Sequence, residues 1–149
     1  MEKCDIHLVA GFKDAGKPSY INENLLVSKE RIAVLLNEYG RESIKEGFEV
    51  RELKSGCPCC DGARFFLRDL QNFYNELRPK EIVVELSAMA NLEEMHRIMQ
   101  KKFSLLFVGR VRYYYVINVK TIDKRELISG PFIRTQIGYA DSVVFTRHS

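Results

Sequence analysis

The sequence lacks several features that mark membrane-spanning, secreted or nucleic-acid-binding proteins. It has no apolar stretch of about 18 residues, the length needed to cross a bilayer, and its N-terminus lacks the basic-then-apolar profile of a secretory signal. Its formal net charge is only +3, and basic residues are interspersed with acidic ones. We therefore expect a soluble, cytoplasmic protein that has reduced cysteines and binds neither membranes nor nucleic acids.

The chain also lacks internal repeats, low-complexity segments and a linker, so residues 1–149 are expected to form a single domain. Short apolar runs alternate with amphipathic stretches, and several runs are continuous and β-branched, as in strands buried on both faces. This alternation predicts an α/β fold, a mostly parallel sheet flanked by helices, with ligands at the carboxyl ends of its strands. The expected strands are 5–10, 32–36, 50–53, 81–86, 111–119 and 142–146.

Helices are expected between these strands. Asp61 is a suitable cap for one of them, which must end before Pro79. Asn91 and Glu94 resemble a capping box, and Pro131 suits the first turn of the last helix. The expected helices are 20–28, 61–78, 92–102 and 132–140.

Residues 11–19 have the frame of a phosphate-binding loop, GxxxxGK(S/T), but carry a proline where the hydroxyl belongs. Glycines let such a loop curl so that its N–H groups converge on phosphate oxygens, and the lysine reaches the outer phosphates. Pro18 has neither a hydroxyl for magnesium nor an N–H to donate, so anion binding should survive better than metal-assisted phosphoryl transfer. The alternative is a glycine turn in an ordinary α/β protein. The residues expected at the phosphates are Gly11, Asp14, Ala15, Gly16, Lys17, Pro18 and Ser19.

Three of the four cysteines, Cys57, Cys59 and Cys60, lie within four residues, between an expected strand and an expected helix. Thiolates near a helix N-terminus are stabilised by its positive end and are good ligands for a soft cation. Zinc accepts tetrahedral thiolate ligation, and other late first-row divalent ions would compete for the site. The alternative is a group of reduced thiols without a ligand. Cys4 is expected to be a small core residue.

Glu85 ends an expected buried strand, where an ionised carboxylate costs free energy unless it is paired or metal-bound. We favour a functional, catalytic role for Glu85 over a solvated strand end. The role of Glu38 stays open, because the sequence at 37–40 is also typical of a turn. Alternation of aromatic and other residues at 110–115 favours sheet packing over nucleic-acid binding.

Five sequence signatures occur in order along nearly the whole chain. They are Gly-Phe-x-x-Ala-Gly-Lys at 11–17, Arg-Ile-Ala-Val-Leu-Leu-Asn-Glu-Tyr-Gly at 31–40, Ser-Gly-Cys-Pro-Cys-Cys at 55–60, Ile-Val-Val-Glu-Leu-Ser at 82–87 and Gln-Ile-Gly-Tyr-Ala-Asp-Ser-Val-Val at 136–144. In this order they resemble the CobW/HypB/UreG group of P-loop GTPases, most closely its CobW-like branch. Five ordered matches are far more specific than the phosphate-binding loop alone.

The resemblance implies a P-loop NTPase-like fold and a GTP-binding, metal-handling protein. The family hydrolyses GTP to deliver zinc, cobalt or related metals, so a metalloprotein client or a cobalamin-pathway protein is the expected partner. By the same resemblance, Cys57, Cys59 and Cys60 of the CxCC motif bind the metal, Glu85 orients water or residual magnesium, and Thr146 begins the base-recognition motif.

Departures from the family pattern fall on magnesium, the terminal phosphate and the base. Pro18 replaces the magnesium threonine, Ala88 replaces the glycine of an ExxG motif, and Lys45 would bring a cation where the family has an anion. Residues 146–149 lack the lysine and aspartate of (N/T)KxD. These changes imply a minimal, degenerate relative without the family's C-terminal domain, with weak or absent hydrolysis and an impaired magnesium site. The alternative is a non-catalytic adaptor that pairs with an intact GTPase of the family or with a metalloprotein client. The expected assemblies are a homodimer or a heterodimer with an intact family GTPase.

Overall fold

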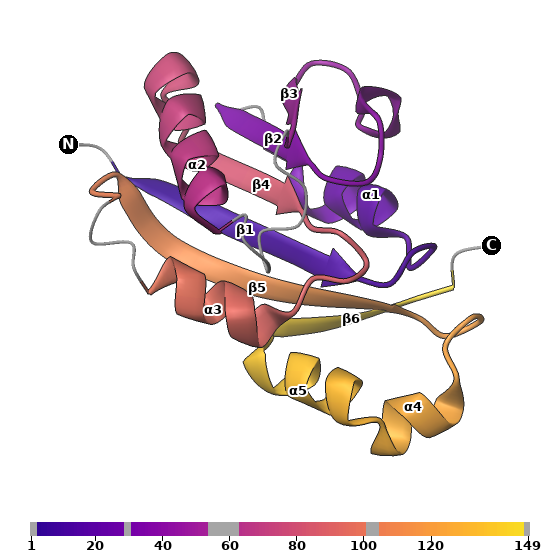
Figure 1. Ribbon diagram of the computed structural model, residues 1–149. Helices are drawn as coiled ribbons and strands as arrows, with labels where there is room; N and C mark the ends of the chain where they lie inside the picture. The colour runs from indigo at the N-terminus through magenta and orange to yellow at the C-terminus, as the bar shows by residue number, and fades with distance from the viewer. Residues whose placement is uncertain (1–2, 29–30, 54–62, 101–104, 148–149) are drawn as a thin grey trace.

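The structure, a computed structural model, describes residues 3–28, 31–53, 63–100 and 105–147. Within these residues, six strands form one sheet in the order β3-β2-β4-β1-β5-β6, and each neighbouring pair is parallel (Figure 1). This arrangement confirms the expected α/β fold of the P-loop NTPase type. The strands are β1 (Cys4–Gly11), β2 (Ile32–Leu36), β3 (Glu49–Glu52), β4 (Glu81–Glu85), β5 (Val108–Asn118) and β6 (Ser142–Thr146).

Helices flank both faces of the sheet but cover them unequally (Figure 1). The helical segments are α1 (Lys17–Tyr20), the π-helix η1 (Ile21–Leu25), the 3-10 helix η2 (Arg41–Ser43), α2 (Ala63–Leu77), α3 (Leu92–Met99), α4 (Lys124–Ser129) and α5 (Pro131–Tyr139). One face packs against α2, α3 and α5 through an apolar cluster that includes Phe66, Met95 and Ile133. The other face packs against the region of α1 and η1 through Ile21 and Leu26.

Strand β5 contributes to both apolar clusters, because successive side chains of a strand point to opposite faces. Tyr113 and Tyr115 belong to the cluster under α2, α3 and α5, whereas Tyr114 and Val116 belong to the cluster under α1 and η1. The aromatic run at 110–115 therefore packs within the sheet, as the alternation predicts.

The first helix differs most from its prediction. Helix α1 begins at Lys17, before the predicted start at residue 20, and gives way at Ile21 to η1, which ends at Leu25. Pro18 lies in the first turn, where its fixed φ favours early helix formation and its missing N–H costs nothing. Helix α4 was not predicted, and β5 begins already at Val108.

The cap of α3 forms only half of the predicted capping box. The Asn91 Oδ1 accepts the N–H of Glu93 at 2.9 Å, as an N-cap should. The carboxylate of Glu94 pairs instead with Arg97 on the same helix. Asp61, the predicted cap of α2, lies outside the described residues.

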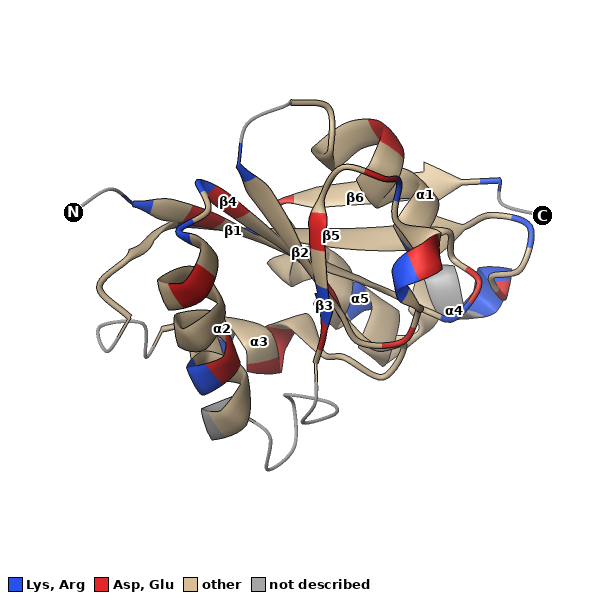
Figure 2. Cartoon of the chain, turned by 90° about the horizontal axis from the view of Figure 1, so that it is seen from above, with Lys and Arg blue, Asp and Glu red and all other residues tan. Residues whose placement is uncertain are grey.

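Basic and acidic positions lie close together on α2, on α4 and at the strand ends (Figure 2). This mixture fits the small net charge of +3. Among the residues that the structure describes, no helix is both long and apolar enough to span a membrane.

Candidate functional site

The predicted phosphate-binding loop connects the carboxyl end of β1 to α1. Its curl depends on positive φ angles of 151° at Gly11, 64° at Asp14 and 92° at Gly16. Glycine is required at Gly11 for a second reason, since a Cβ there would lie 2.5 Å from the backbone oxygen of Val116. The loop therefore curls at the edge of the sheet where parallel strands end, the usual ligand-binding edge of such folds.

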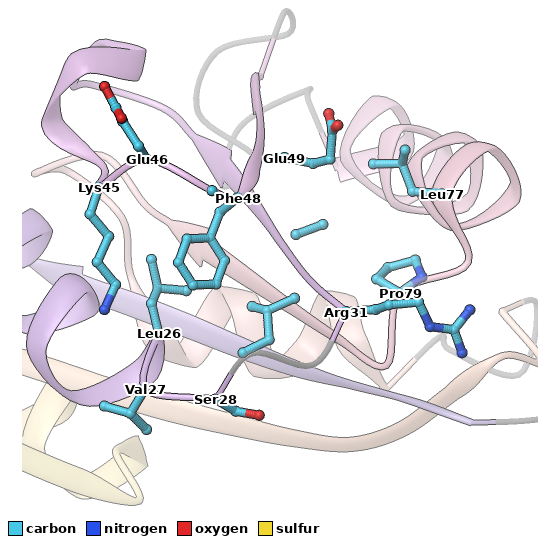
Figure 3. A pocket seen from close by; sticks show the side chains of 13 residues that line it. Leu26, Val27, Ser28, Arg31, Lys45, Glu46, Phe48, Glu49, Leu77 and Pro79 are labelled. Carbon is cyan, nitrogen blue, oxygen red and sulfur yellow. The ribbon is translucent and has the colours of Figure 1, made fainter.

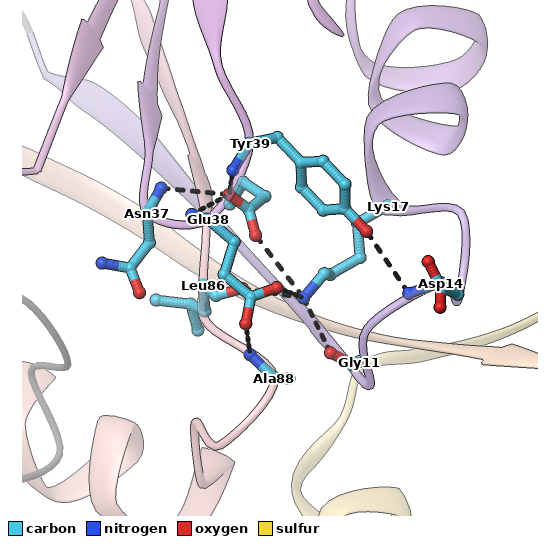
Figure 4. A network of polar contacts seen from close by, with 9 residues as sticks. Gly11, Asp14, Lys17, Asn37, Glu38, Tyr39, Leu86 and Ala88 are labelled. Atoms are coloured by element: carbon cyan, nitrogen blue, oxygen red, sulfur yellow. Dashed lines mark hydrogen bonds and ion pairs between the residues drawn. The ribbon is translucent and has the colours of Figure 1, made fainter.

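The side chain of Lys17 is fully buried, and its ammonium group lies inside the loop (Figure 4). Its Nζ donates to the backbone oxygens of Gly11 at 2.7 Å and Leu86 at 2.9 Å. It also donates to Glu38 Oε2 at 3.3 Å and lies 3.4 Å from Glu85 Oε2. A buried ammonium needs such partners, because burial removes its hydration. Two carboxylates and two carbonyls therefore compensate the Lys17 charge.

Glu85, the predicted catalytic residue, is fully buried at the end of β4. Its Oε1 accepts the backbone N–H groups of Asn37 at 3.0 Å and Glu38 at 2.9 Å, with a longer contact to that of Tyr39 at 3.5 Å. Its Oε2 faces Lys17 and has no hydrogen-bond partner among the described residues. Glu85 thus lies at the end of the sheet that carries the curled loop, where its contacts hold residues 37–39 in place.

Residues 37–39, here called the strap, follow β2 and lie over the phosphate-binding loop (Figure 4). The Glu38 carboxylate bridges two elements: its Oε2 contacts Lys17, and its Oε1 accepts the N–H of Ala88 at 2.7 Å. The Tyr39 hydroxyl accepts the N–H of Asp14 at 3.3 Å. Partial burial raises the pKa of Tyr39 above its ordinary value, so this hydroxyl stays neutral at physiological pH.

Sequence reasoning left Glu38 undecided and missed Tyr39. The signal that could have identified them is their position directly after β2, because Leu36 pairs with Glu85 in the sheet. Parallel pairing brings the residues that follow Leu36 to the end of β4 and hence to the phosphate-binding loop.

The contacts of Lys17, Glu38 and Ala88 and the ring of Pro18 indicate how well the site would fit phosphate and magnesium, the two ligands expected here. An anionic oxygen fits, because the Glu38 carboxylate already accepts from Lys17 and from the Ala88 N–H. Magnesium fits poorly, because Pro18 carries a ring in place of the coordinating hydroxyl. The site therefore suits phosphate better than it suits a phosphate–magnesium complex.

Two strand ends clamp the loop from the opposite side. The Asn118 Nδ2 at the end of β5 donates to the backbone oxygen of Asp14 at 2.9 Å. The Thr146 hydroxyl at the end of β6 donates to the backbone oxygen of Ala15 at 2.6 Å. Thr146, predicted to begin the base-recognition motif, thus contacts the loop directly, whereas Asn118 was missed by sequence reasoning. Its place at the carboxyl end of the strand beside β1 was the available signal.

A pocket of about 510 Å³ adjoins the loop between α1 and the end of β6. Gly16 and Ser19 line one side of the pocket, and Thr146 and Arg147 line another. Small-molecule pockets have typical volumes of about 300 to 1,000 Å³. The loop and this pocket together provide space for a phosphorylated ligand with a larger organic group.

Lys45 lies in a different pocket, of about 750 Å³ (Figure 3). Its Nζ is 5.7 Å from the centroid of the Phe48 ring, and Leu26 and Pro79 also line this pocket. The expectation that Lys45 brings a cation to the phosphates thus finds no support in its contacts.

The predicted metal ligands Cys57, Cys59 and Cys60 lie outside the described residues. In the part of the chain that the structure describes, no group of three or more His, Cys, Asp or Glu side chains could hold a metal ion. Cys4 is buried in the core as expected, and this burial raises the pKa of its thiol to about 12. The evidence for a metal site is therefore the sequence at 57–60.

Comparisons with known proteins agree with this fold. A family model described as CobW/HypB/UreG, nucleotide-binding domain, matches residues 5–148. The Zn(II)-bound YjiA GTPase from E. coli matches with a TM-score of 0.65 and 20% sequence identity, over 99% of this chain and 50% of that chain. A Zn(II)-bound triple mutant of YjiA matches with a TM-score of 0.66 and 19% sequence identity, over 97% of this chain and 49% of that chain. FlhF complexed with GMPPNP and Mg²⁺ matches with a TM-score of 0.50 and 14% sequence identity, over 97% of this chain and 56% of that chain.

At these identities, the solved structures show a shared fold. This chain spans about half the length of the solved chains that it matches. No curated protein matches it in sequence. The matched family segment contains the phosphate-binding loop, the strap, Glu85 and Thr146.

Proposed function

Because this chain belongs to the CobW/HypB/UreG family through its nucleotide-binding domain, we propose that it binds a nucleotide by the phosphates at the loop between β1 and α1. The observation that carries this proposal is the buried Lys17 ammonium, which already binds an anionic oxygen inside the curled loop. Burying a lysine ammonium costs free energy, and an apolar side chain at this position would avoid that cost. A role in binding phosphate would explain why a lysine is buried here.

Each part of the site has a proposed role. The N–H groups of residues 11–17 would surround the phosphates, and Lys17 would neutralise their charge. The pocket between Ser19 and Thr146 would receive the nucleoside. GTP is the nucleotide that the family relationship favours, although residues 146–149 lack the aspartate that selects guanine.

We propose weak or absent hydrolysis for the same site. Pro18 supplies no hydroxyl to magnesium, and Ala88 carries a Cβ where the family pattern has glycine. Glu85 is the residue that would orient water, yet its Oε1 is engaged by backbone N–H groups of the strap.

We also propose that Cys57, Cys59 and Cys60 bind zinc or cobalt, with the protein acting as a metallochaperone. Zinc is favoured over cobalt by the Zn(II)-bound state named for the E. coli YjiA GTPase. A reducing cytoplasm would keep the thiols available, and the recipient would be a metalloprotein client or a cobalamin-pathway protein.

Isothermal titration calorimetry with GTP, GDP, ATP and ADP, with and without Mg²⁺, tests nucleotide binding. We expect binding in the micromolar range, weakened about tenfold or more in Lys17→Ala through loss of charged hydrogen bonds. Lys13→Ala is the matched control, because Lys13 is an exposed lysine of the same loop. Equal weakening in both variants, or no binding to any nucleotide by the natural protein, would contradict the proposal.

A second candidate is a non-catalytic adaptor that pairs with an intact family GTPase or a metalloprotein client. The observation that favours it is the simultaneous change at Pro18, Ala88 and residues 146–149, which affects magnesium, terminal phosphate and base together. The adaptor function would be supported if calorimetry detects no binding of any of the four nucleotides and the chain forms a stable complex with such a GTPase in size-exclusion chromatography.

A further inference from the structure

Asp14 holds a backbone conformation that glycine usually takes. Its φ is 64°, in the left-handed region. The N–H of Ala15 donates to the oxygen of Phe12 at 3.1 Å, so residues 12–15 form a tight turn with Asp14 at its third position. A positive φ there is typical of a type II turn and favours glycine. Aspartate tolerates this region better than most residues but still pays for its Cβ, so the loop needs contacts that hold Asp14 in place.

Side chains from two distant strand ends bind both backbone polar groups of Asp14. The Tyr39 hydroxyl of the strap accepts its N–H at 3.3 Å (Figure 4), and the Asn118 Nδ2 donates to its oxygen at 2.9 Å. Asn118 is only 3% exposed, and its Oδ1 accepts the N–H of Lys120 at 3.0 Å. Both ends of the Asn118 amide are thus engaged, so this side chain is the more firmly fixed of the two contacts.

The direction of the Asp14 carbonyl affects what the loop presents to a phosphate. Because a peptide unit is planar and trans, its C=O and N–H point in opposite directions. With the Asp14 oxygen turned toward Asn118, the Ala15 N–H points away from Asn118 and closes the turn. Gly16 and Lys17 follow directly, so rotation of the Asp14 peptide would change the direction of their N–H groups. A loop that is only partly in the competent form binds its ligand more weakly by that fraction.

We infer that Asn118 is a positioning residue of the proposed nucleotide site, which holds Asp14 in its left-handed conformation and keeps the phosphate-binding loop curled before a ligand arrives. The inference rests on the proposed function. Asn118 contacts a backbone atom, so its hydrogen bond persists when the side chain at position 14 is changed. The need for Asn118 then depends on how readily residue 14 takes a positive φ: glycine there should make it dispensable, and alanine should not.

Calorimetry with GDP on the full chain tests this inference as a double-mutant cycle. Asn118→Ala should weaken GDP binding by about fivefold or more, because Asp14 no longer stays in the competent conformation. Combined with Asp14→Gly, the same substitution should weaken binding by less than about twofold, and combined with Asp14→Ala by about fivefold or more. Asp14→Gly and Asp14→Ala both remove the carboxylate, so its charge cannot explain a difference between them. Asn75→Ala, the same change at an exposed asparagine of α2, is the matched control and should leave binding unchanged.

Hydrogen exchange gives a readout that needs no nucleotide. The Ala15 amide, which closes the turn, should exchange faster in Asn118→Ala, and the acceleration should be smaller when Asp14→Gly is added. Asn118→Asp is a second variant for this measurement, because it keeps an acceptor for the Lys120 N–H and loses the donor to Asp14. It should show the same pattern. The amide of Leu8, in the core of β1, should exchange as in the natural protein.

The possible results separate this inference from the proposed function. Equal weakening of GDP binding by Asn118→Ala with aspartate, glycine and alanine at position 14, or an Ala15 amide insensitive to Asn118, would overturn the inference while nucleotide binding stands. Faster exchange at Leu8 as well as Ala15 would show a general loss of structure and would also overturn the positioning role. Binding of GDP to none of the proteins would overturn both proposals.

Discussion

Two glycines show how differently single residues contribute to this chain. Gly11 has a φ of +151°, and a Cβ on it would lie 2.5 Å from Val116 O, a backbone atom of the neighbouring strand. Gly138 lies inside α5, and an added Cβ would meet nothing within 4 Å. The first glycine is therefore required by the shape of the phosphate-binding loop, whereas the second is only a weak helix former.

Substitution of these glycines should have opposite effects on stability. Gly11→Ala should lower the free energy of unfolding by about 3 kcal/mol, because it combines backbone strain with a steric clash. Gly138→Ala should raise it by about 0.5 to 1 kcal/mol through better helix propensity. Urea unfolding followed by circular dichroism measures both changes. A loss of similar size for the two variants would contradict this account of Gly11.

At the scale of the elements, the candidate site is assembled from strand ends. Parallel pairing places the carboxyl ends of β1, β2, β4, β5 and β6 at one edge of the sheet (Figure 1). Each strand contributes one part there: the loop, the strap, Glu85, Asn118 and Thr146. The loop is consequently held on one side by two carboxylates and on the other by two hydrogen-bonding side chains.

The connection between β3 and α2 supplies the proposed metal site, so its cysteines should control metal content. Cys59→Ser combined with Cys60→Ser should abolish zinc or cobalt binding, because two of three thiolate ligands are lost. Inductively coupled plasma analysis of protein purified without a metal-affinity tag measures the metal per chain. Cys4→Ala is the matched control, since Cys4 is buried in the core. Metal content unchanged in the double variant, or lost equally in the control, would refute the site.

Across the whole molecule, burial of weak acids couples stability to high pH. Burial raises the pKa of the Cys4 thiol from 9.0, and of the Tyr113 and Tyr115 hydroxyls from 10.0, to about 12 in the folded protein. At pH values below the pKa values of the unfolded chain, these groups are protonated in both the folded and the unfolded state, and the free energy of unfolding is at its full value. As pH rises toward 12, the unfolded chain loses these protons first, so stability must fall.

Urea unfolding midpoints should therefore be nearly constant from about pH 7 to 8.5 and decrease steadily above about pH 9. Tyr115→Phe should flatten this decrease, because it removes one titrating hydroxyl. At pH 7 the variant should lose little stability, since the Tyr115 hydroxyl has no hydrogen-bond partner among the described residues. A pH profile of Tyr115→Phe parallel to that of the natural protein would contradict the role of this hydroxyl.

Prediction from sequence succeeded where the signal is local. The strands at 32–36 and 142–146 have the predicted bounds, because short runs rich in apolar and β-branched residues between turn residues favour strands. Prediction failed for the helix after the loop, where Pro18 moves the helix start forward and η1 follows in place of a regular helix. Propensity alone does not reveal such a change.

The candidate site divides in the same way. The curl at Gly11 and Gly16 was predictable, since the glycine spacing with Lys17 is typical of a phosphate-binding loop, and the positive φ angles of both glycines confirm it. Tyr39 and Asn118 were not, because each acts on the loop across a large separation in sequence, 25 residues for Tyr39 and 104 for Asn118. Only strand pairing decides which of many polar residues reach the loop.

The sequence by itself determined the parallel α/β fold, the family and the curled loop proposed to bind phosphate, because alternating apolar runs and glycine spacing are properties of neighbouring residues. Only the tertiary structure decided what that loop contacts. Lys17 and Glu38 are 21 residues apart and Glu38 and Ala88 are 50 apart, and their contacts exist because β2 and β4 are adjacent in the sheet. Strand order brings these groups together, and no local pattern encodes such contacts.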